Sequence, residues 1–421
     1  MKIVRNVAFF VIILLVAIGS YILGTKTSVI PSDQPLREQV IKFVEDEREK
    51  GKEINLVAKF GTNFSKIDLS GTNLKGVILK GADFSYANLR GAILEGSNLE
   101  GTNFKYANLE RVNLIQANLN KTNLSYANLS KTNLEGVEIK ESNLSYAILG
   151  NTNMKKSVMK GIDLSYADIT NSHIFGADLE GANLEGADLT LSDLRTANLE
   201  GANMLGVALD FANLKGANIK KANLEGAFLH RTILDEADMS ESNLSSANMQ
   251  RTDLQSTNLS GANLSEANVT DSNLWKANLS NTTMINTNFT GAQLWDSVIK
   301  NAKISAAAFY MANLEGSDFS ESEVKESNFK NASLDNINFT KANLQDSDFK
   351  DASLKQANFT EANLQDASLK STNLTGAILK DTNLNGADLT DAIITGANIN
   401  TTKMDNIIGY TPKKQPRVDS N

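Results

Sequence analysis

The sequence predicts an all-β protein, a quadrilateral β-helix or β-solenoid of about 17 coils. Two features of the sequence lead to this fold. First, every fifth residue from Phe64 to Met404 is Leu, Ile, Met, Phe or Val, which gives 69 consecutive pentads without an insertion. Second, an aromatic residue returns every twenty positions, at Tyr86, Tyr106, Tyr126, Tyr146 and Tyr166. If four pentads close one coil, 69 pentads make about 17 coils.

Each pentad combines a short extended piece with a corner. The residue two positions before the large apolar one is always Ala, Ser, Thr, Val or Ile, as in Ala182-Asn183-Leu184. In an extended chain these two side chains point to one side, and the Asn or Asp between them points away. The other two residues must turn a corner. Of the 23 glycines between residues 61 and 404, 22 fall in one corner register, with Gly150 as the exception, and that stretch contains no proline.

Aromatic spacing fixes four pentads per coil, because residues twenty apart then become vertical neighbours at about 4.8 Å. The five tyrosines would stack in one column, and Trp275 and Trp295 in another on the outside. Ten residues lead to the opposite side of a coil. We therefore expect the rings of six phenylalanines spaced ten residues apart to meet across the axis inside the solenoid: Phe309, Phe319, Phe329, Phe339, Phe349 and Phe359.

Residues 1–24 are predicted to be a transmembrane signal anchor. Residues 7–24 carry no charge, which is close to the length that a membrane-spanning helix needs, and Lys2 and Arg5 precede them. The positive-inside rule places the N-terminus in the cytoplasm and the solenoid outside it, in a single-pass topology. The alternative is a signal peptide whose cleavage leaves a secreted protein.

Four regions follow from the composition: 1–24 as the anchor, 25–60 as a linker and an amphipathic capping helix, 61–404 as the solenoid, and 405–421 as a C-terminal cap and disordered tail. The helix is expected to start near Pro35 and to stop near Gly51. It is expected to dock its apolar stripe on the first coil. At the other end, Ile407, Ile408 and Tyr410 are expected to fold over the last coil, because an open coil end needs a cover.

The motif A(N/D)LXX, present as Ala182-Asn183-Leu184-Glu185-Gly186, resembles the pentapeptide-repeat family across residues 61–404. The resemblance implies a right-handed quadrilateral β-helix with the large and the small residue pointing inward. It also implies an alternative to the cap, a homodimer through the C-terminal coil. It does not imply one function, because members include DNA mimics that protect topoisomerases, secreted effectors and membrane-associated proteins.

No arrangement of residues indicates an enzyme, a cofactor or a metal. The chain has no cysteine, which excludes disulfides and thiolate ligands, and its two histidines, His173 and His230, are placed on different sides of the coil. No phosphate loop or nucleophile elbow occurs. Charges alternate along the predicted columns, and Glu321, Lys341 and Glu361 are expected to form ladder salt bridges.

The predicted function is a non-enzymatic, membrane-anchored scaffold that binds a protein partner outside the cytoplasm. Large apolar residues at outward positions are the candidate protein contacts: Leu191, Phe211, Phe228, Trp275, Trp295, Tyr310 and Met311. The alternative is a DNA mimic that binds a topoisomerase. Of 49 acidic and 41 basic residues, nine and twelve lie outside 61–404, which leaves 40 and 29. Because the two signs are interleaved, no side is purely acidic, and neither DNA mimicry nor nucleic-acid binding is favoured.

Overall fold

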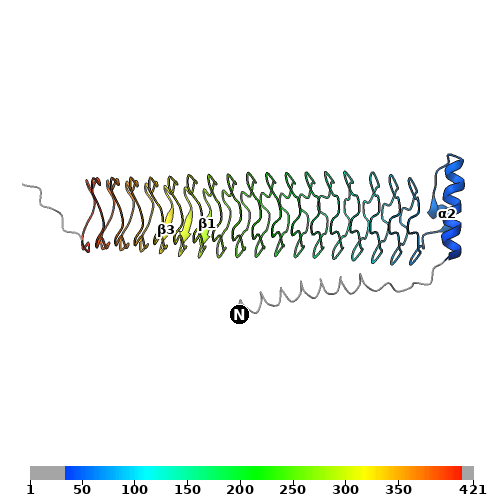
Figure 1. Cartoon of the computed structure of the whole chain (residues 1–421), viewed down its shortest axis with the longest axis horizontal. Helices are drawn as coiled ribbons and strands as arrows, with labels where there is room; N and C mark the ends of the chain where they lie inside the picture. The colour runs from blue at the N-terminus through cyan, green and yellow to red at the C-terminus, as the bar shows by residue number, and fades with distance from the viewer. Residues whose placement is uncertain (1–33, 410–421) are drawn as a thin grey trace, which may run out of the picture. The chain divides into compact units, whose positions relative to one another are not determined.

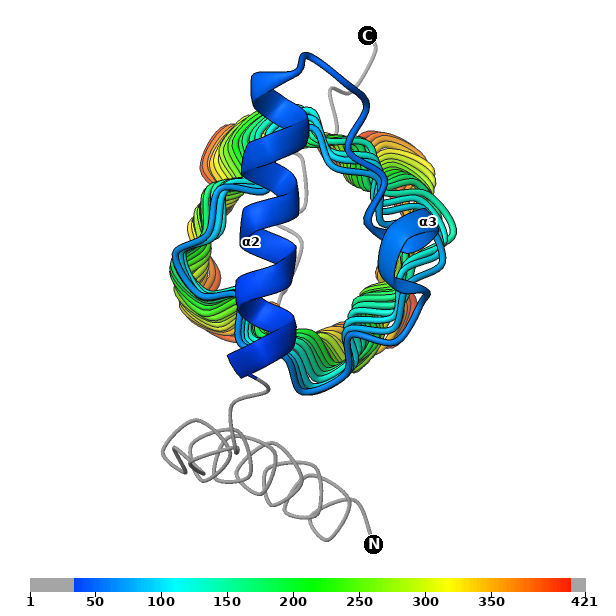
Figure 2. The same cartoon turned by 90° about the vertical axis from the view of Figure 1, so that its right-hand side faces the viewer.

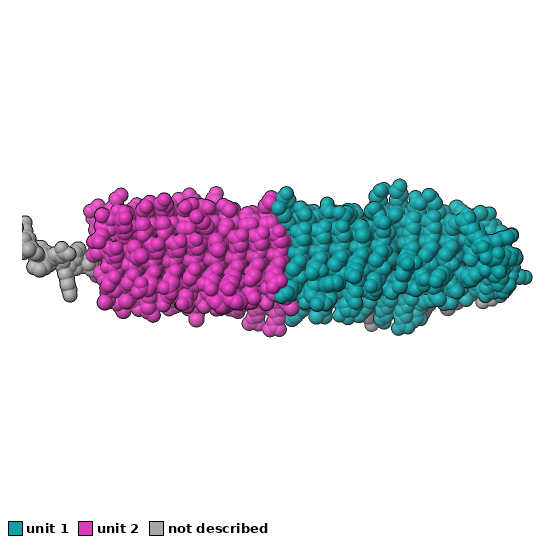
Figure 3. All heavy atoms as spheres, turned by 90° about the horizontal axis from the view of Figure 1, so that it is seen from above, with its two compact units in different colours: residues 1–228 teal, residues 229–421 magenta. Residues whose placement is uncertain are grey.

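One pentad forms one side of a four-sided coil in the computed structural model, which describes residues 34–409. Parallel backbone bridges join residues twenty positions apart, for example Asn88 with Asn108 and Asn343 with Asn363. The chain divides into two compact units, Met1–Phe228 and Leu229–Asn421, and the same coil repeats within each (Figure 1 and Figure 3). Within each unit, the predicted coil of four pentads is confirmed.

The corners explain the glycine register. The second corner residue has a positive φ, 66° at Gly71 and 62° at Gly186, a conformation that glycine adopts without steric cost. Many other residue types occupy the same position with a similar φ, such as Tyr86 at 60° and Leu191 at 62°. The corner conformation is therefore imposed by the coil, and glycine is only its least strained occupant.

The inward register is confirmed from residue 64 to residue 389, where every large apolar residue of the pentads is buried. The small residues beside them are buried as well. Where the small residue is Ser or Thr, its hydroxyl group commonly donates a hydrogen bond to a backbone carbonyl. Thr102 Oγ1, for example, donates to Leu79 O of the preceding coil at 2.9 Å. This bond satisfies a buried polar group that would otherwise cost stability.

Outward Asn and Asp residues hold the corners in place. The carboxylate of Asp83 accepts from the backbone N–H of Ser85 at 3.0 Å, and the amide of Asn103 donates to the same Asp83 oxygen at 2.9 Å from one coil further on. One side chain thus closes a local turn and links two coils. The sequence predicted that these residues point outward but did not predict this double role.

Phenylalanine rings fill the core of the second unit, as predicted. Phe309 and Phe319 meet at 5.9 Å in an edge-to-face arrangement, whereas Phe309 and Phe329, twenty residues apart, stack at 4.8 Å. Three short parallel strands lie in the same unit: β1 (Thr283–Ile285), β2 (Lys303–Ser305) and β3 (Glu323–Lys325), with Met284 opposite Ile304 and Ile304 opposite Val324. Most other sides of the coils pair through single bridges.

Two helices cover the first coil of unit 1. Helix α2 (Gln34–Glu49) lies across the open end, and α3 (Leu56–Phe60) lies at its edge (Figure 2). Val40 and Val44 of α2 are buried, and Phe43 packs edge-to-face on Phe60 at 5.6 Å. The predicted amphipathic cap is confirmed, with a start and a stop close to those expected.

Two arginines of α2 occupy hydrogen-bonding positions that a preceding coil would fill. Arg37 Nη1 donates to Asp68 O at 2.8 Å, and Arg48 Nη2 donates to Lys75 O at 3.1 Å. In later coils the carbonyls at these positions accept from backbone N–H groups, as Asn88 O does from Leu69 N at 2.7 Å. The guanidinium groups therefore satisfy the exposed edge of the first coil.

The opposite end, in unit 2, has a different character. Core-type residues of the last coil are only half-buried, including Ile394, Ile399 and Met404, and Ile393 and Ile408 are exposed. Within residues 34–409, no segment folds over this coil, and Ile407 and Ile408 belong to the coil itself. The part of the predicted cap that involves Tyr410 and the tail lies outside the described residues.

The predicted membrane anchor, residues 1–24, also lies outside the described residues. Among residues 34–409, neither helix combines the length and the apolar character needed to cross a membrane.

Candidate protein-contact surfaces

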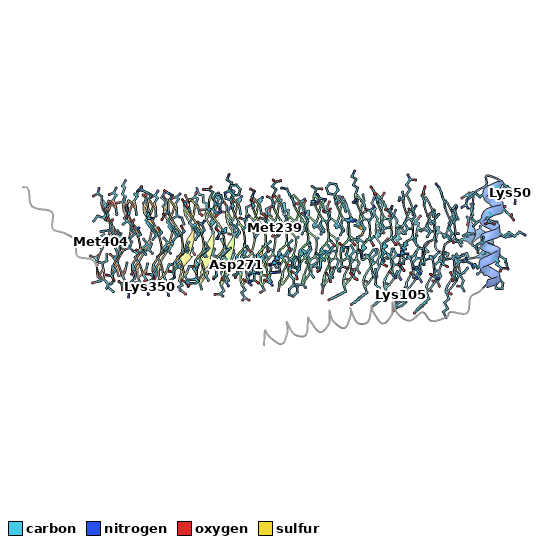
Figure 4. The ribbon with its side chains drawn as sticks, viewed as in Figure 1. Lys50, Lys105, Met239, Asp271, Lys350 and Met404 are labelled. Carbon is cyan, nitrogen blue, oxygen red and sulfur yellow. The ribbon has the colours of Figure 1, made fainter. Side chains whose placement is uncertain are left out.

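Side chains form closely spaced layers along each unit, and most of the outward ones are polar or charged (Figure 4). Ion pairs link successive coils, such as Lys75 with Glu95 at 2.7 Å and Lys160 with Glu180 at 2.7 Å. Large apolar side chains on these faces are exceptions, and they carry the candidate contact sites.

In unit 1, the structure brings Leu191, Phe211 and Phe228 to one side of the coil. Leu191 and Phe211 occupy the same corner in successive coils, and their exposed fractions are 59% and 47%. Phe228 is half-buried on the adjoining strand, where it pairs with Ala208. These three residues, which we call the unit 1 patch, lie together as predicted.

In unit 2, Trp275 and Trp295 stack at 4.5 Å between ring centroids, as predicted. Trp275 is half-buried and Trp295 is exposed. Lys276 Nζ lies 4.6 Å from the Trp275 ring centroid, so a cation covers part of this pair. Sequence reasoning missed Val298, which is exposed on the strand that follows the corner at Trp295. Its signal was an apolar residue at a position that is usually Asn or Asp.

One side of the coil runs from Gly291 to Trp295. Tyr310 and Met311 lie at its Gly291 edge, opposite the edge that carries Trp295. Gly291 N donates to Tyr310 O at 2.9 Å, which places Tyr310 and Met311 one coil above that edge. Both are exposed, Met311 by 57%. Between the two apolar edges, Asn313 donates to Gln293 at 3.4 Å. We refer to Trp275, Trp295, Val298, Tyr310 and Met311 as the unit 2 patch.

The tyrosine column is confirmed as a stack. Neighbouring rings lie 4.9, 5.0, 4.8 and 5.2 Å apart from Tyr86 to Tyr166. Lys105 Nζ lies 5.2 Å from the ring centroid of Tyr106 and 5.8 Å from that of Tyr126. Burial, followed by the neighbouring phenols Tyr146 and Tyr106, raises the pKa of Tyr126. Each ring stacks on at least one other ring of the column, which stabilises successive corners, and Tyr86 at the end of the stack remains 51% exposed.

The two histidines, with the charged residues near each, lie apart within residues 34–409. His173 lies on an outward strand position between Asn153 and Asp193, and His230 lies at a corner of the other unit. Arg195 donates to Asp193 and lowers the pKa of that carboxyl group. Within residues 34–409, no group of three or more His, Cys, Asp or Glu could hold a metal ion.

The coil with its inward small and large residues defines a repeat solenoid. Sequence comparison then identifies the class: the chain belongs to the pentapeptide-repeat family. The family model described as pentapeptide repeats (8 copies) matches residues 60–96, 97–136, 174–207, 192–231, 222–261, 262–298 and 367–406. A second model, pentapeptide repeat region, matches residues 302–378. Membership agrees with the predicted right-handed β-helix.

Solved structures of the same class show limited similarity. HetL, a pentapeptide repeat protein involved in heterocyst differentiation regulation in the cyanobacterium Nostoc, is 28% identical over 58% of this chain and 90% of its own, with a TM-score of 0.20. QnrB1, a plasmid-mediated fluoroquinolone resistance protein, is 17% identical over 46% of this chain and 90% of its own, with a TM-score of 0.28. With TM-scores this low, the family assignment depends on the repeat sequence. No curated protein matches the chain.

Proposed function

We propose that this protein is a non-enzymatic scaffold, anchored in a membrane by residues 1–24, whose solenoid binds a protein partner outside the cytoplasm. The exposed apolar patches are the observation that carries the proposal. Met311 and Leu191 are each more than half exposed on faces that also carry ion pairs, Arg251 with Asp271 and Arg195 with Asp193. Such residues are typical of partner contacts.

The core also favours a scaffold. Small and large side chains fill the inside of every coil from residue 64 to residue 389, which leaves the outer surface for recognition. A solenoid whose coils are linked by backbone bridges presents its surface residues at fixed spacing. Such a surface suits binding through side chains on its faces.

A DNA mimic is a weaker second candidate, because it needs a sustained acidic face. Lysines are interspersed among the carboxylates and pair with them. In the second unit, Lys330 binds Asp348 at 2.9 Å and Lys370 binds Asp388 at 2.9 Å. These pairs lower the negative potential along the column that carries them.

Protease treatment of intact cells tests the location. A protease added from outside should remove the solenoid if it lies outside the cytoplasm and should leave it intact if it lies inside. The mass of the intact mature chain tests the anchor, because a cleaved signal peptide would remove about the first 20 residues. Full protection from protease in intact cells, with cleavage after lysis, would refute the extracytoplasmic scaffold.

A further inference from the structure

The unit 2 patch has a distinctive arrangement of apolar and acidic groups. Trp295 lies at one edge of a strand side and Met311, one coil further on, at the other. Three residues lie between the two edges, so four steps of at most about 3.3 Å each set them at most about 13 Å apart along the strand. The centre is polar and hydrogen-bonded, between Gln293 and Asn313. The surface therefore offers two separate apolar contacts rather than one continuous apolar face.

Stacking determines which part of the tryptophans a partner can reach. Because Trp275 and Trp295 lie face to face at 4.5 Å, their rings present edges more than open faces. A ligand that needs a free aromatic face, such as a sugar ring, fits this arrangement poorly. Apolar side chains of a peptide can pack against ring edges and against the Met311 side chain.

Charges around the patch favour a basic partner. Asp296 follows Trp295 directly, and Glu315 lies one coil above Trp295, since Asp296 N donates to Glu315 O at 2.9 Å. Among the described residues, neither carboxylate has a cationic group within 4.0 Å. Both remain available to a partner at the edge of an apolar contact.

The nearby cations are already engaged. Lys330, which follows Tyr310 in its column, pairs with Asp348 at 2.9 Å, and Arg251 lies 3.7 Å from Asp271. Lys276 lies over the Trp275 ring. Lys276 keeps its charge there, and Lys300 lies 3.8 Å from Glu321. The two carboxylates Asp296 and Glu315 against the single charge of Lys276 leave a negative balance at the two apolar edges.

We propose that the unit 2 patch binds a protein segment that carries apolar side chains together with lysine or arginine. The apolar side chains would contact Trp295 and Met311, and the basic groups would pair with Asp296 and Glu315. The inference rests on the proposed role as a protein-binding scaffold and gives that partner a chemical class. Apolar contact supplies most of the affinity, and charge supplies the selection against acidic segments.

The tryptophans make the test direct, because Trp275 and Trp295 are the only two in the chain. The full chain in detergent micelles would be titrated with a short Leu/Lys peptide without tryptophan, and with the same peptide carrying Glu in place of Lys. We expect saturable changes in tryptophan emission with the basic peptide, and affinity at least about fivefold weaker for the acidic one.

Matched variants separate this site from general attraction to an acidic protein. The double variant Asp296→Asn with Glu315→Gln should lower the affinity for the basic peptide about fivefold. The double variant Tyr310→Ser with Met311→Asn should lower it about tenfold. The control pair Asp346→Asn with Asp366→Asn removes the same charge from another column of unit 2 and should leave affinity within about twofold. Asn suits the positive φ of Asp296, Met311, Asp346 and Asp366.

Three results would overturn the inference: no saturable emission change, equal affinity for the basic and acidic peptides, or equal effects of the two charge pairs. An emission change on deletion of residues 411–421 without peptide would also overturn it, since the chain's own basic tail would then be the occupant. None of these results bears on protease access in cells, so failure here is distinguishable from failure of the scaffold proposal.

Discussion

The ring of Tyr166 lies directly against Gly186 in the next coil. A Cβ atom built at Gly186 would come within 2.6 Å of Tyr166 Cε1, and the Tyr166 hydroxyl donates to Glu185 at 2.9 Å. The glycine therefore receives the last ring of the tyrosine stack, which ends at this point. Glycine is required here for two reasons, the positive φ of 62° and the contact with the ring.

We predict that Gly186→Ala destabilises the protein more than Gly181→Ala does. Both positions have a φ near 63°, but a Cβ at Gly181 meets nothing within 4 Å. The left-handed conformation alone costs alanine about 1–2 kcal/mol, and only Gly186→Ala must also displace the ring. Urea unfolding of the two variants gives the comparison. Equal losses of stability would show that the Tyr166 ring moves away without cost. If Gly186→Ala is the more destabilising, making both variants in a Tyr166→Ser background should reduce the difference between them.

Alkaline pH should weaken the tyrosine column. Burial, and then the hydrogen bond to Glu185, raises the pKa of Tyr166. A pKa that is higher in the folded than in the unfolded state stabilises the fold below the unfolded value, which is about 10. That contribution is lost as the pH rises through the folded value. We therefore expect stability to fall above about pH 10.

Absorbance at the phenolate band, followed against pH, measures this effect. Subtracting the Tyr166→Phe titration from that of the unchanged chain isolates one phenol, and Glu185→Gln should shift its titration to lower pH. A Tyr166 phenol that titrates at the ordinary value in the folded protein would contradict the hydrogen-bonded stack.

Repetition explains how much of the fold could be predicted. A period of five with a small and a large residue two apart predicts a coil with both side chains inward, and the tyrosines and tryptophans twenty apart indicate four pentads per coil. The stacks of Trp275 with Trp295 and of Tyr86 with Tyr106 follow from that spacing alone. The candidate contact residues were found for the same reason, since an apolar residue at an outward position interrupts a regular polar pattern.

Contacts outside the repeat could not be predicted in the same way. Nothing in the sequence shows that Arg37 reaches a carbonyl 31 residues away. The side-chain rotamer also determines which neighbour a charged residue pairs with. Lys341 pairs with Glu361 at 3.9 Å as predicted, whereas Glu321 pairs with Lys300 at 3.8 Å instead of with Lys341. Long flexible side chains on a surface select partners by local geometry, which spacing does not specify.

The arginine cap should matter for unit 1. Arg37→Met with Arg48→Met keeps most of the apolar stem but removes the donors to the carbonyls of the first coil. Each lost hydrogen bond should cost about 1 kcal/mol. The control is Lys42→Met on the exposed face of α2. Amide hydrogen exchange should accelerate in the first coil of the double variant. Unchanged protection there would mean that water replaces the guanidinium groups at no cost.

Substitution inside the coil tests the packing register most directly. Ala187 is fully buried beside Leu184 and Leu189, whereas its neighbour Asp188 points outward. Ala187→Leu inserts a large side chain into a filled core and should cost roughly 1–3 kcal/mol or more. Asp188→Asn, one residue away, retains the side-chain oxygen that accepts from Thr190 N at 2.9 Å, and should be nearly neutral. Thermal unfolding of the two variants provides the measurement. A melting temperature unchanged by Ala187→Leu would require space inside the coil, and the inward register argued from the sequence would then be wrong.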